Sequence, residues 1–138
     1  MALTLTACNL PTQHHADPET EHMVKHERTF TGDFDEVVRA IHRGVVSGSS
    51  SASFEDSSDL NVGDVRCSTM VFERYSMVGA NRLSLTVTVV GRERDLGLAA
   101  ITSGGSQAIF WKVNSYGEDA FLTQFIGLVN TIVERQSA

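Results

Sequence analysis

The sequence is poor in cysteine, in basic residues and in long apolar runs, and each shortage excludes a class of protein. Its 138 residues include only two cysteines, one of them Cys8 near the N-terminus, so a disulfide framework is not expected. Acidic residues outnumber basic ones 17 to 11, for a net charge of −6. Nucleic acids and anionic membranes bind basic patches, so neither is expected as a main partner. No apolar run approaches the ~18 residues of a transmembrane helix.

The motifs of common active sites are missing as well. The sequence has no P-loop, no G-x-G-x-x-G, no H-E-x-x-H, no C-x-x-C and no G-x-S-x-G. Cys67 lies within a strand pattern and is predicted to be a small buried hydrophobe. The acidic stretch Glu55–Asp59 does not have the spacing of an EF-hand loop, so we interpret it as a solvated connection. We therefore expect no cofactor, no metal and no catalytic residue.

The first 22 residues differ from the rest of the chain. They have no helical or strand periodicity and are rich in polar and acidic residues, so residues 1–22 are predicted to be a disordered extension and residues 23–138 a single cytoplasmic domain. Leu5–Cys8 resembles a lipoprotein cleavage box, although the stretch before it is too short for a signal peptide. The alternative is a membrane-anchored lipoprotein attached through Cys8.

The domain begins with a strand and a helix. Lys25–Thr31 alternates and contains Thr and Phe, which predicts the first strand. Asp33 followed by Glu36 fits a capping box, so a helix is expected to begin there. Apolar residues at helical spacing continue to Gly48, which is predicted to end the helix as its C′ residue.

The outer face of this helix carries charged and polar side chains. Asp35 and Arg39 are one turn apart, and this spacing predicts an ion pair between them. His42, which stands next to Arg43 in the sequence, is interpreted as a half-exposed surface histidine. We therefore expect this face to be solvated.

The remaining sequence predicts further strands and one long helix. Alternating apolar and hydroxyl residues mark the strands, and glycines mark the turns between them. Ser115 and Glu118 form a second capping box, followed by a wide apolar stripe to about Arg135. The predicted strands are Ser51–Glu55, Val65–Ser76, Leu83–Val89, Leu96–Ala100 and Gln107–Val113, and the apolar residues of the helix are Phe121, Leu122, Phe125, Ile126, Leu128, Val129, Ile132 and Val133.

The element order is therefore β-α-β-β-β-β-β-α. We expect a two-layer α+β domain in which a curved antiparallel sheet packs against the long C-terminal helix.

Two segments contain the candidate ligand-binding residues. The long strand alternates so that Arg66 and Arg74 share one face with Ser68, Met70 and Phe72. An arginine there can bind a carboxylate or phosphate, or it can pair with an acid on a neighbouring strand. The glycine-rich loop offers hydroxyls and free N–H groups to an anion, but it also fits a simple hairpin turn. The candidates are Arg66, Glu73, Arg74, Tyr75, Ser103, Gly104, Gly105 and Ser106.

Several segments together resemble a small bacterial domain family of unknown function, over Met23 to about Val133. They are Ser51–Asp59, Gly63–Cys67, Val71–Ser76, Asn81–Leu85 and Ala100–Ala108. This resemblance implies no activity, substrate or catalytic residue. The element order is also loosely similar to helix-grip domains, in which a curved sheet wraps a long C-terminal helix around an apolar cavity. This chain departs from them by having one helix, not two, after the first strand.

Two functions remain open. The first is a non-catalytic binding domain for a small apolar or acidic ligand, held between the sheet and the C-terminal helix with a polar contact from Arg74 or Tyr75. The second is an assembly module that forms a homodimer through its sheet face or an edge strand. The position of four apolar residues, Met70, Phe72, Ile109 and Trp111, would discriminate between them. A closed space lined by these side chains would favour ligand binding, and an exposed patch of them would favour an interface.

Overall fold

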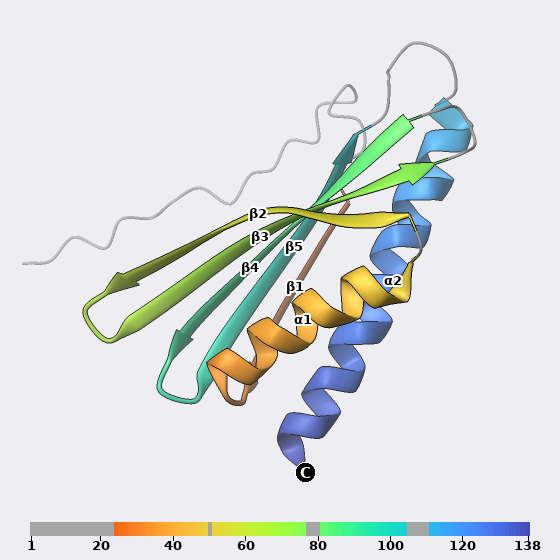
Figure 1. Cartoon of the computed structure of the whole chain (residues 1–138). Helices are drawn as coiled ribbons and strands as arrows, with labels where there is room; N and C mark the ends of the chain where they lie inside the picture. The colour runs from red at the N-terminus through yellow and green to blue at the C-terminus, as the bar shows by residue number, and fades with distance from the viewer. Residues whose placement is uncertain (1–23, 50, 77–80, 105–110) are drawn as a thin grey trace, which may run out of the picture.

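The computed structural model describes residues 24–49, 51–76, 81–104 and 111–138. The predicted disordered extension, residues 1–22, lies outside the described residues. The described chain forms one open antiparallel sheet and two helices (Figure 1). The elements are β1 (Val24–Thr31), α1 (Phe34–Gly48), β2 (Ala52–Val62), β3 (Val65–Ser76), β4 (Asn81–Arg92), β5 (Asp95–Gly104) and α2 (Trp111–Ser137), and the strand order is β1-β5-β4-β3-β2.

The predicted α+β class, with an antiparallel sheet and a long C-terminal helix, is confirmed. The difference lies near the last predicted strand, Gln107–Val113. Its residues 107–110 lie outside the described residues, and Trp111–Val113 form the start of α2. The capping box predicted at Ser115 therefore does not begin the helix. Aromatic and β-branched side chains in this stretch favour a strand locally, but Trp111–Val113 are helical.

Strand β2 is longer than predicted. Glu55–Asp59, interpreted as a solvated connection, is instead the middle of an 11-residue edge strand whose side chains are almost all exposed. An edge strand has one free side and tolerates polar and acidic residues that a central strand would not. The pairing register with β3 shifts between Phe54 and Asp56. This bulge reverses the alternation, so that Ser57 and Asp59 face the same side as Phe54.

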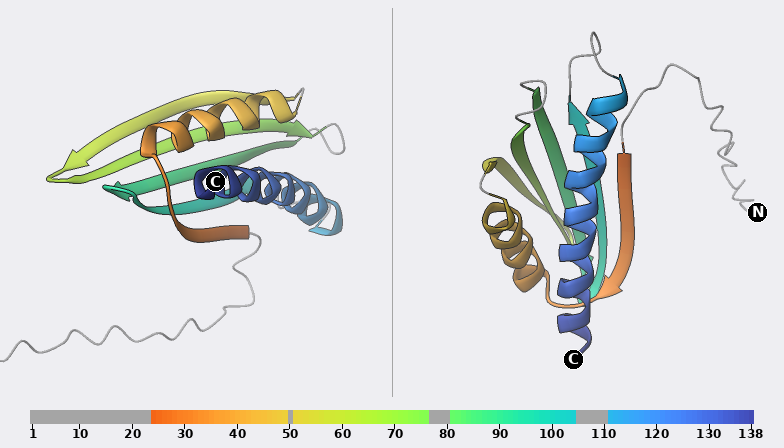
Figure 2. Two further views of the ribbon diagram at one scale, coloured as in Figure 1. Left: turned by 90° about the horizontal axis from the view of Figure 1, so that it is seen from below. Right: turned by 90° about the vertical axis from the view of Figure 1, so that its right-hand side faces the viewer.

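Both helices lie on one face of the sheet, and the core lies between them and the strands (Figure 2). Strand β4 shows the reason most clearly, because Leu83, Leu85, Val87 and Val89 alternate with hydroxyl residues and all four face the helices. Helix α2 contributes the predicted stripe from Phe121 onward. The buried apolar residues are Phe34, Val37, Ile41, Val45, Met70, Phe72, Leu83, Leu85, Val87, Val89, Leu96, Leu98, Ala100, Phe121, Leu122, Phe125, Val129 and Ile132.

Helix α1 is fixed at its start and at its crossing with α2. Asp33 caps it as predicted, because its side chain accepts a hydrogen bond from the Glu36 backbone N–H at 2.9 Å. The helix includes Gly48 and has Ser49 as its C-cap, so Gly48 is the last helical residue and not the predicted C′ residue. At Gly44 a Cβ atom would lie 2.4 Å from the Leu128 side chain. The missing side chain therefore lets the two helices approach closely.

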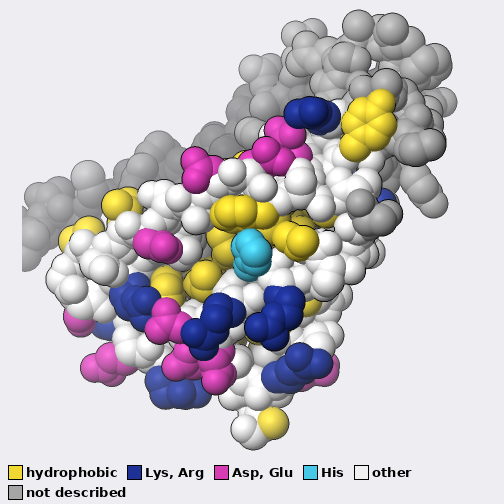
Figure 3. Space-filling view, in the orientation of Figure 1, with side chains coloured by type: hydrophobic (Ala, Val, Ile, Leu, Met, Phe, Trp, Pro, Cys, Tyr) yellow, Lys and Arg dark blue, Asp and Glu magenta, His cyan; other side chains and the backbone are white. Residues whose placement is uncertain are grey.

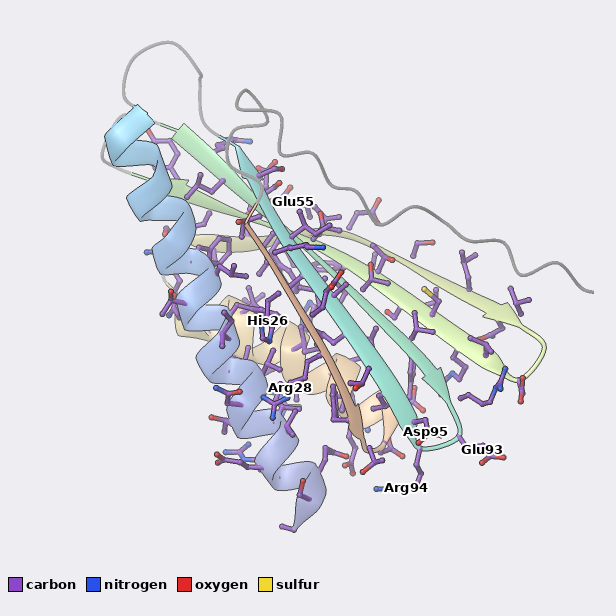
Figure 4. The ribbon with its side chains drawn as sticks, turned by 180° about the vertical axis from the view of Figure 1, so that it is seen from behind. His26, Arg28, Glu55, Glu93, Arg94 and Asp95 are labelled. Carbon is purple, nitrogen blue, oxygen red and sulfur yellow. The ribbon has the colours of Figure 1, made fainter. Side chains whose placement is uncertain are left out.

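Helix α2 closes the β1 side of the helix layer. The guanidinium of Arg28 donates a hydrogen bond to Asn130 of α2, and Gln136 accepts one from the Asp33 backbone N–H at 2.8 Å. His26 and Arg28 lie between β1 and α2, as the view from behind shows (Figure 4). The opposite side, between α1 and β2, is not closed in this way.

Candidate functional site

A groove runs between α1 and the β2–β3 hairpin, and we call it the α1–β2 groove. Its volume is about 510 Å³, which lies within the usual range for small-molecule sites. Three elements contribute its lining. The residues are Val38, Arg39, His42, Arg43, Val46 and Ser47 from α1, Phe54, Ser57 and Asp59 from β2, and Ser68 and Met70 from β3.

The wall formed by α1 follows from helical spacing. Arg39, His42, Arg43 and Val46 stand at i, i+3, i+4 and i+7, so they form one stripe along the helix. This stripe is distinct from the buried one that begins at Phe34. All four side chains are exposed, and they present two guanidiniums, an imidazole and an apolar group to the groove.

Arg66 and Asp35 tie the start of α1 to the start of β3. The Arg66 guanidinium donates two hydrogen bonds to the Asp35 carboxylate, at 2.8 and 3.0 Å, and lies 4.3 Å from the centre of the Phe34 ring. The predicted Asp35–Arg39 ion pair is therefore wrong, because Arg66 is the partner of Asp35. Arg39 makes no ion pair within the part of the chain that the structure describes.

The Arg66 hydrogen bond lowers the pKa of Asp35 below its ordinary value, and the Arg66 and Arg39 charges act in the same direction. A lowered pKa in the folded state stabilises the fold above the ordinary carboxyl range, and this contribution is lost as the pH falls through the lowered pKa. In an NMR titration, we expect Arg66→Ala to raise the pKa of Asp35 toward its ordinary value. Arg92→Ala is the control and should leave Asp35 unchanged. An unaltered Asp35 titration in Arg66→Ala would contradict this assignment.

An aromatic cluster lies beside the groove. The His42 ring meets the Phe54 ring edge-on at 4.7 Å, and Phe54 meets the buried Phe72 at 5.8 Å. This contact joins α1 to β2 near the bulge. His42 and Phe54 both line the groove.

The floor of the groove is apolar with one hydroxyl. Met70 and Ser68 are both almost fully buried, and both line the groove. Figure 3 shows this side of the molecule, with a histidine surrounded by apolar side chains and Lys and Arg side chains along one border. The groove thus combines an apolar centre with polar groups at its margins, as small-ligand sites usually do.

Among the predicted binding residues that the structure describes, only Arg66 is separate, because the others lie together at the opposite end of the sheet. Arg66 and Arg74 share a face of β3, as predicted, but they lie near opposite ends of the strand. The expected acid partner of Arg74 is not found among the described residues. Its guanidinium lies 5.5 Å from the centre of the Phe121 ring instead.

The other predicted residues that the structure describes lie on the opposite face of the sheet or at the end of β5. Glu73 pairs with Arg82 at 3.2 Å, and Tyr75 is exposed beyond it. The Ser103 hydroxyl shares a 2.8 Å hydrogen bond with Ser84. Gly104 is the last residue of β5 and has a φ of 133°, and a Cβ atom there would lie 2.4 Å from the Arg82 carbonyl oxygen. Gly105 and Ser106 lie outside the described residues.

The space beneath α2, where a ligand was expected, is filled by core side chains from Phe121 onward. A smaller cavity of about 220 Å³ remains between the two helices, beside Phe125 and Leu128. Phe72 is fully buried, and Met70 is buried beneath the α1–β2 groove. Ile109 and the Trp111 side chain lie outside what the structure describes. The largest difference from the expected site is therefore its position, at α1 and not at α2.

Residues 24–49, 51–76, 81–104 and 111–138 contain no group of three or more His, Cys, Asp or Glu side chains placed to hold a metal ion. Over the same residues, no helix is long and apolar enough to span a membrane.

Comparison with known proteins gives a family without an assigned activity. The sequence matches the family of unknown function DUF6054 over residues 23–133, and the chain belongs to this family. No curated protein matches the sequence.

Proposed function

We propose that this chain is a non-catalytic binding domain that holds a small, partly apolar ligand in the α1–β2 groove. The observation that carries the proposal is the pair Arg39 and Arg43. Both line the groove, and neither makes an ion pair within the described part of the chain. Two free guanidiniums beside an apolar floor favour a ligand with one acidic group and an apolar body.

The opposite wall limits the charge of the ligand. Asp59 faces the groove from β2, so a ligand with negative charge along its whole length would be repelled there. A monoanionic amphiphile fits better. Its acidic group would lie against α1, and its apolar part would lie over Met70 and beside Val46 and Phe54.

The non-catalytic interpretation rests on the geometry of the polar groups. Ser68, His42 and Asp59 all line the groove, and a serine, a histidine and an aspartate can form a hydrolytic triad. Such a triad requires a hydrogen bond from the nucleophile to the base and from the base to the acid. No hydrogen bond joins these three side chains in the described residues, and the His42 ring packs against Phe54 instead.

The proposal is tested with freshly purified full-length chain. Native mass spectrometry should reveal any ligand that co-purifies. In a thermal-shift panel of straight-chain carboxylates, decanoate at saturation should raise the melting temperature by several degrees, because binding to the folded state alone stabilises it. Decanol, the matched neutral control, should have a smaller effect. Equal shifts with both compounds would contradict recognition of the acidic group, and no shift with any of them would contradict the proposal.

A further inference from the structure

The second face of the sheet carries no helix among the described residues (Figure 4). The pairing register fixes which side chains lie there. One row crosses all five strands and consists of Leu60, Cys67, Val90, Gly97 and Thr29. Cys67, predicted to be buried in the core, therefore lies on this open face and is only partly buried.

The centre of this open face has no charged side chain. The neighbouring rows place Val71, Ile101 and Ala99 among threonines. A fully solvated sheet face usually carries lysine and glutamate, whereas interface centres are depleted in charge and bordered by a polar rim.

The rim charges of the open face are partly neutralised within the chain. Arg92 lies 3.3 Å from Asp64 at one end of the strands, and Arg82 pairs with Glu73 at the other end. Two such faces can therefore meet without bringing an unpaired arginine of one copy against an unpaired arginine of the other.

The open face has a protruding edge and a hollow. Leu60 and Val62 on β2 protrude, with 62% and 77% of their surface exposed. The hollow, of about 630 Å³, extends from β3 across β4 and β5 to β1, and its lining includes Val65, Val90, Arg92, Asp95, Gly97 and Thr29. Protrusion and hollow lie toward the same end of the strands, because Leu60 and Gly97 share one row.

We propose that a second copy of this chain covers the open face, with a two-fold axis running along β4. Rotation about this axis turns the two sheets face to face and exchanges their β2 and β1 edges. The protruding β2 edge of each copy then lies over the hollow of the other, which makes the contact self-complementary, as a two-fold interface requires. This dimer does not depend on the α1–β2 groove, which opens on the other side of the sheet.

The area is sufficient for a stable dimer. Five strands spaced ~4.8 Å apart, with about eight residues each at ~3.3 Å per residue, cover roughly 600 Å² per copy. The two copies together would bury about 1,200 Å², near the lower limit of specific interfaces.

The test is sedimentation of the full chain over a range of concentrations. The wild-type chain should give twice the mass of one 15.0 kDa chain. Val90→Asp should weaken the dimer at least about 100-fold, because each dimer would bury two unpaired carboxylates near the axis. The matched control is Val46→Asp, since Val46 is equally exposed (39% against 40%) but lies on α1. This control should leave the mass unchanged.

Gly97→Val tests the interface without adding charge. A Cβ atom at Gly97 meets nothing within 4 Å, so the single copy should fold with an unchanged circular dichroism spectrum. The new side chain fills the hollow, and the dimer should weaken at least about tenfold, in line with the cost of overpacking. A monomer mass for the wild-type chain at every concentration would overturn the proposal, whatever else covers the face. A dimer that both Val90→Asp and Gly97→Val leave unchanged would overturn it too.

Discussion

Replacement of Phe125 by alanine should lower the free energy of unfolding by about 3–5 kcal/mol. Phe125 is only 2% exposed and lies in the middle of the buried stripe of α2. Truncation removes the ring from the layer between α2 and the sheet and enlarges the small cavity that Phe125 already borders. Chemical denaturation of the full chain, followed by circular dichroism, measures the loss.

Thr123→Ala is the matched control, because Thr123 is on the same helix but exposed. Its effect should stay within about 0.5 kcal/mol. A loss below about 1 kcal/mol for Phe125→Ala would mean that α2 does not contribute this face to the core.

Replacement of both Arg39 and Arg43 by glutamine should raise the dissociation constant of decanoate about 100-fold. A hydrogen bond to a charged group contributes roughly 1.5–3 kcal/mol, and about 1.4 kcal/mol corresponds to tenfold in affinity. Both side chains are exposed and take no part in the core, so the fold should remain intact. Isothermal titration calorimetry gives the constant.

The control for this pair is Arg94→Gln in the β4–β5 turn, labelled in Figure 4, which is not part of the groove lining. It changes the net charge by one unit and should alter the affinity less than about twofold, because salt screens distant surface charges. A similar loss of affinity in Arg94→Gln and in the double variant would indicate a general charge effect and not a site.

Most of the fold could be predicted from the sequence, because the strong periodicity of its apolar residues identifies the helices and strands. The alternation in β4 and the wide stripe of α2 both match the buried residues. The elements that were predicted wrongly are those in which the local secondary-structure propensity differs from the structure that the rest of the fold imposes. Glu55–Asp59 has weak strand propensity, but the free edge of the sheet tolerates acidic side chains.

The candidate site was harder to predict, because it depends on pairs of residues far apart in the chain. Arg66 was expected to bind a ligand and Arg39 to pair with Asp35. In the structure Arg66 pairs with Asp35, because β3 brings Arg66 to the start of α1, and Arg39 lines the groove. One signal was present in the sequence: Val46 is an apolar residue in the otherwise polar stripe of α1. It indicated that this stripe faces something other than water.

The β2 bulge shows why the second wall of the groove could not be predicted. Simple alternation from Phe54 would place Ser57 and Asp59 on the opposite face of the strand. The bulge between Phe54 and Asp56 moves both side chains into the groove. No sequence pattern in the acidic stretch marks this one-residue shift.

The most direct test of ligand binding in the α1–β2 groove is a two-dimensional NMR titration of the isotope-labelled full chain with decanoate. We expect saturable shifts clustered on the groove lining, including Val38, His42, Val46, Phe54 and Met70. These shifts should disappear at the same decanoate concentration in the Arg39→Gln, Arg43→Gln double variant. Shifts clustered under α2 or on the open face of the sheet, or no saturable shift at all, would contradict ligand binding in the α1–β2 groove.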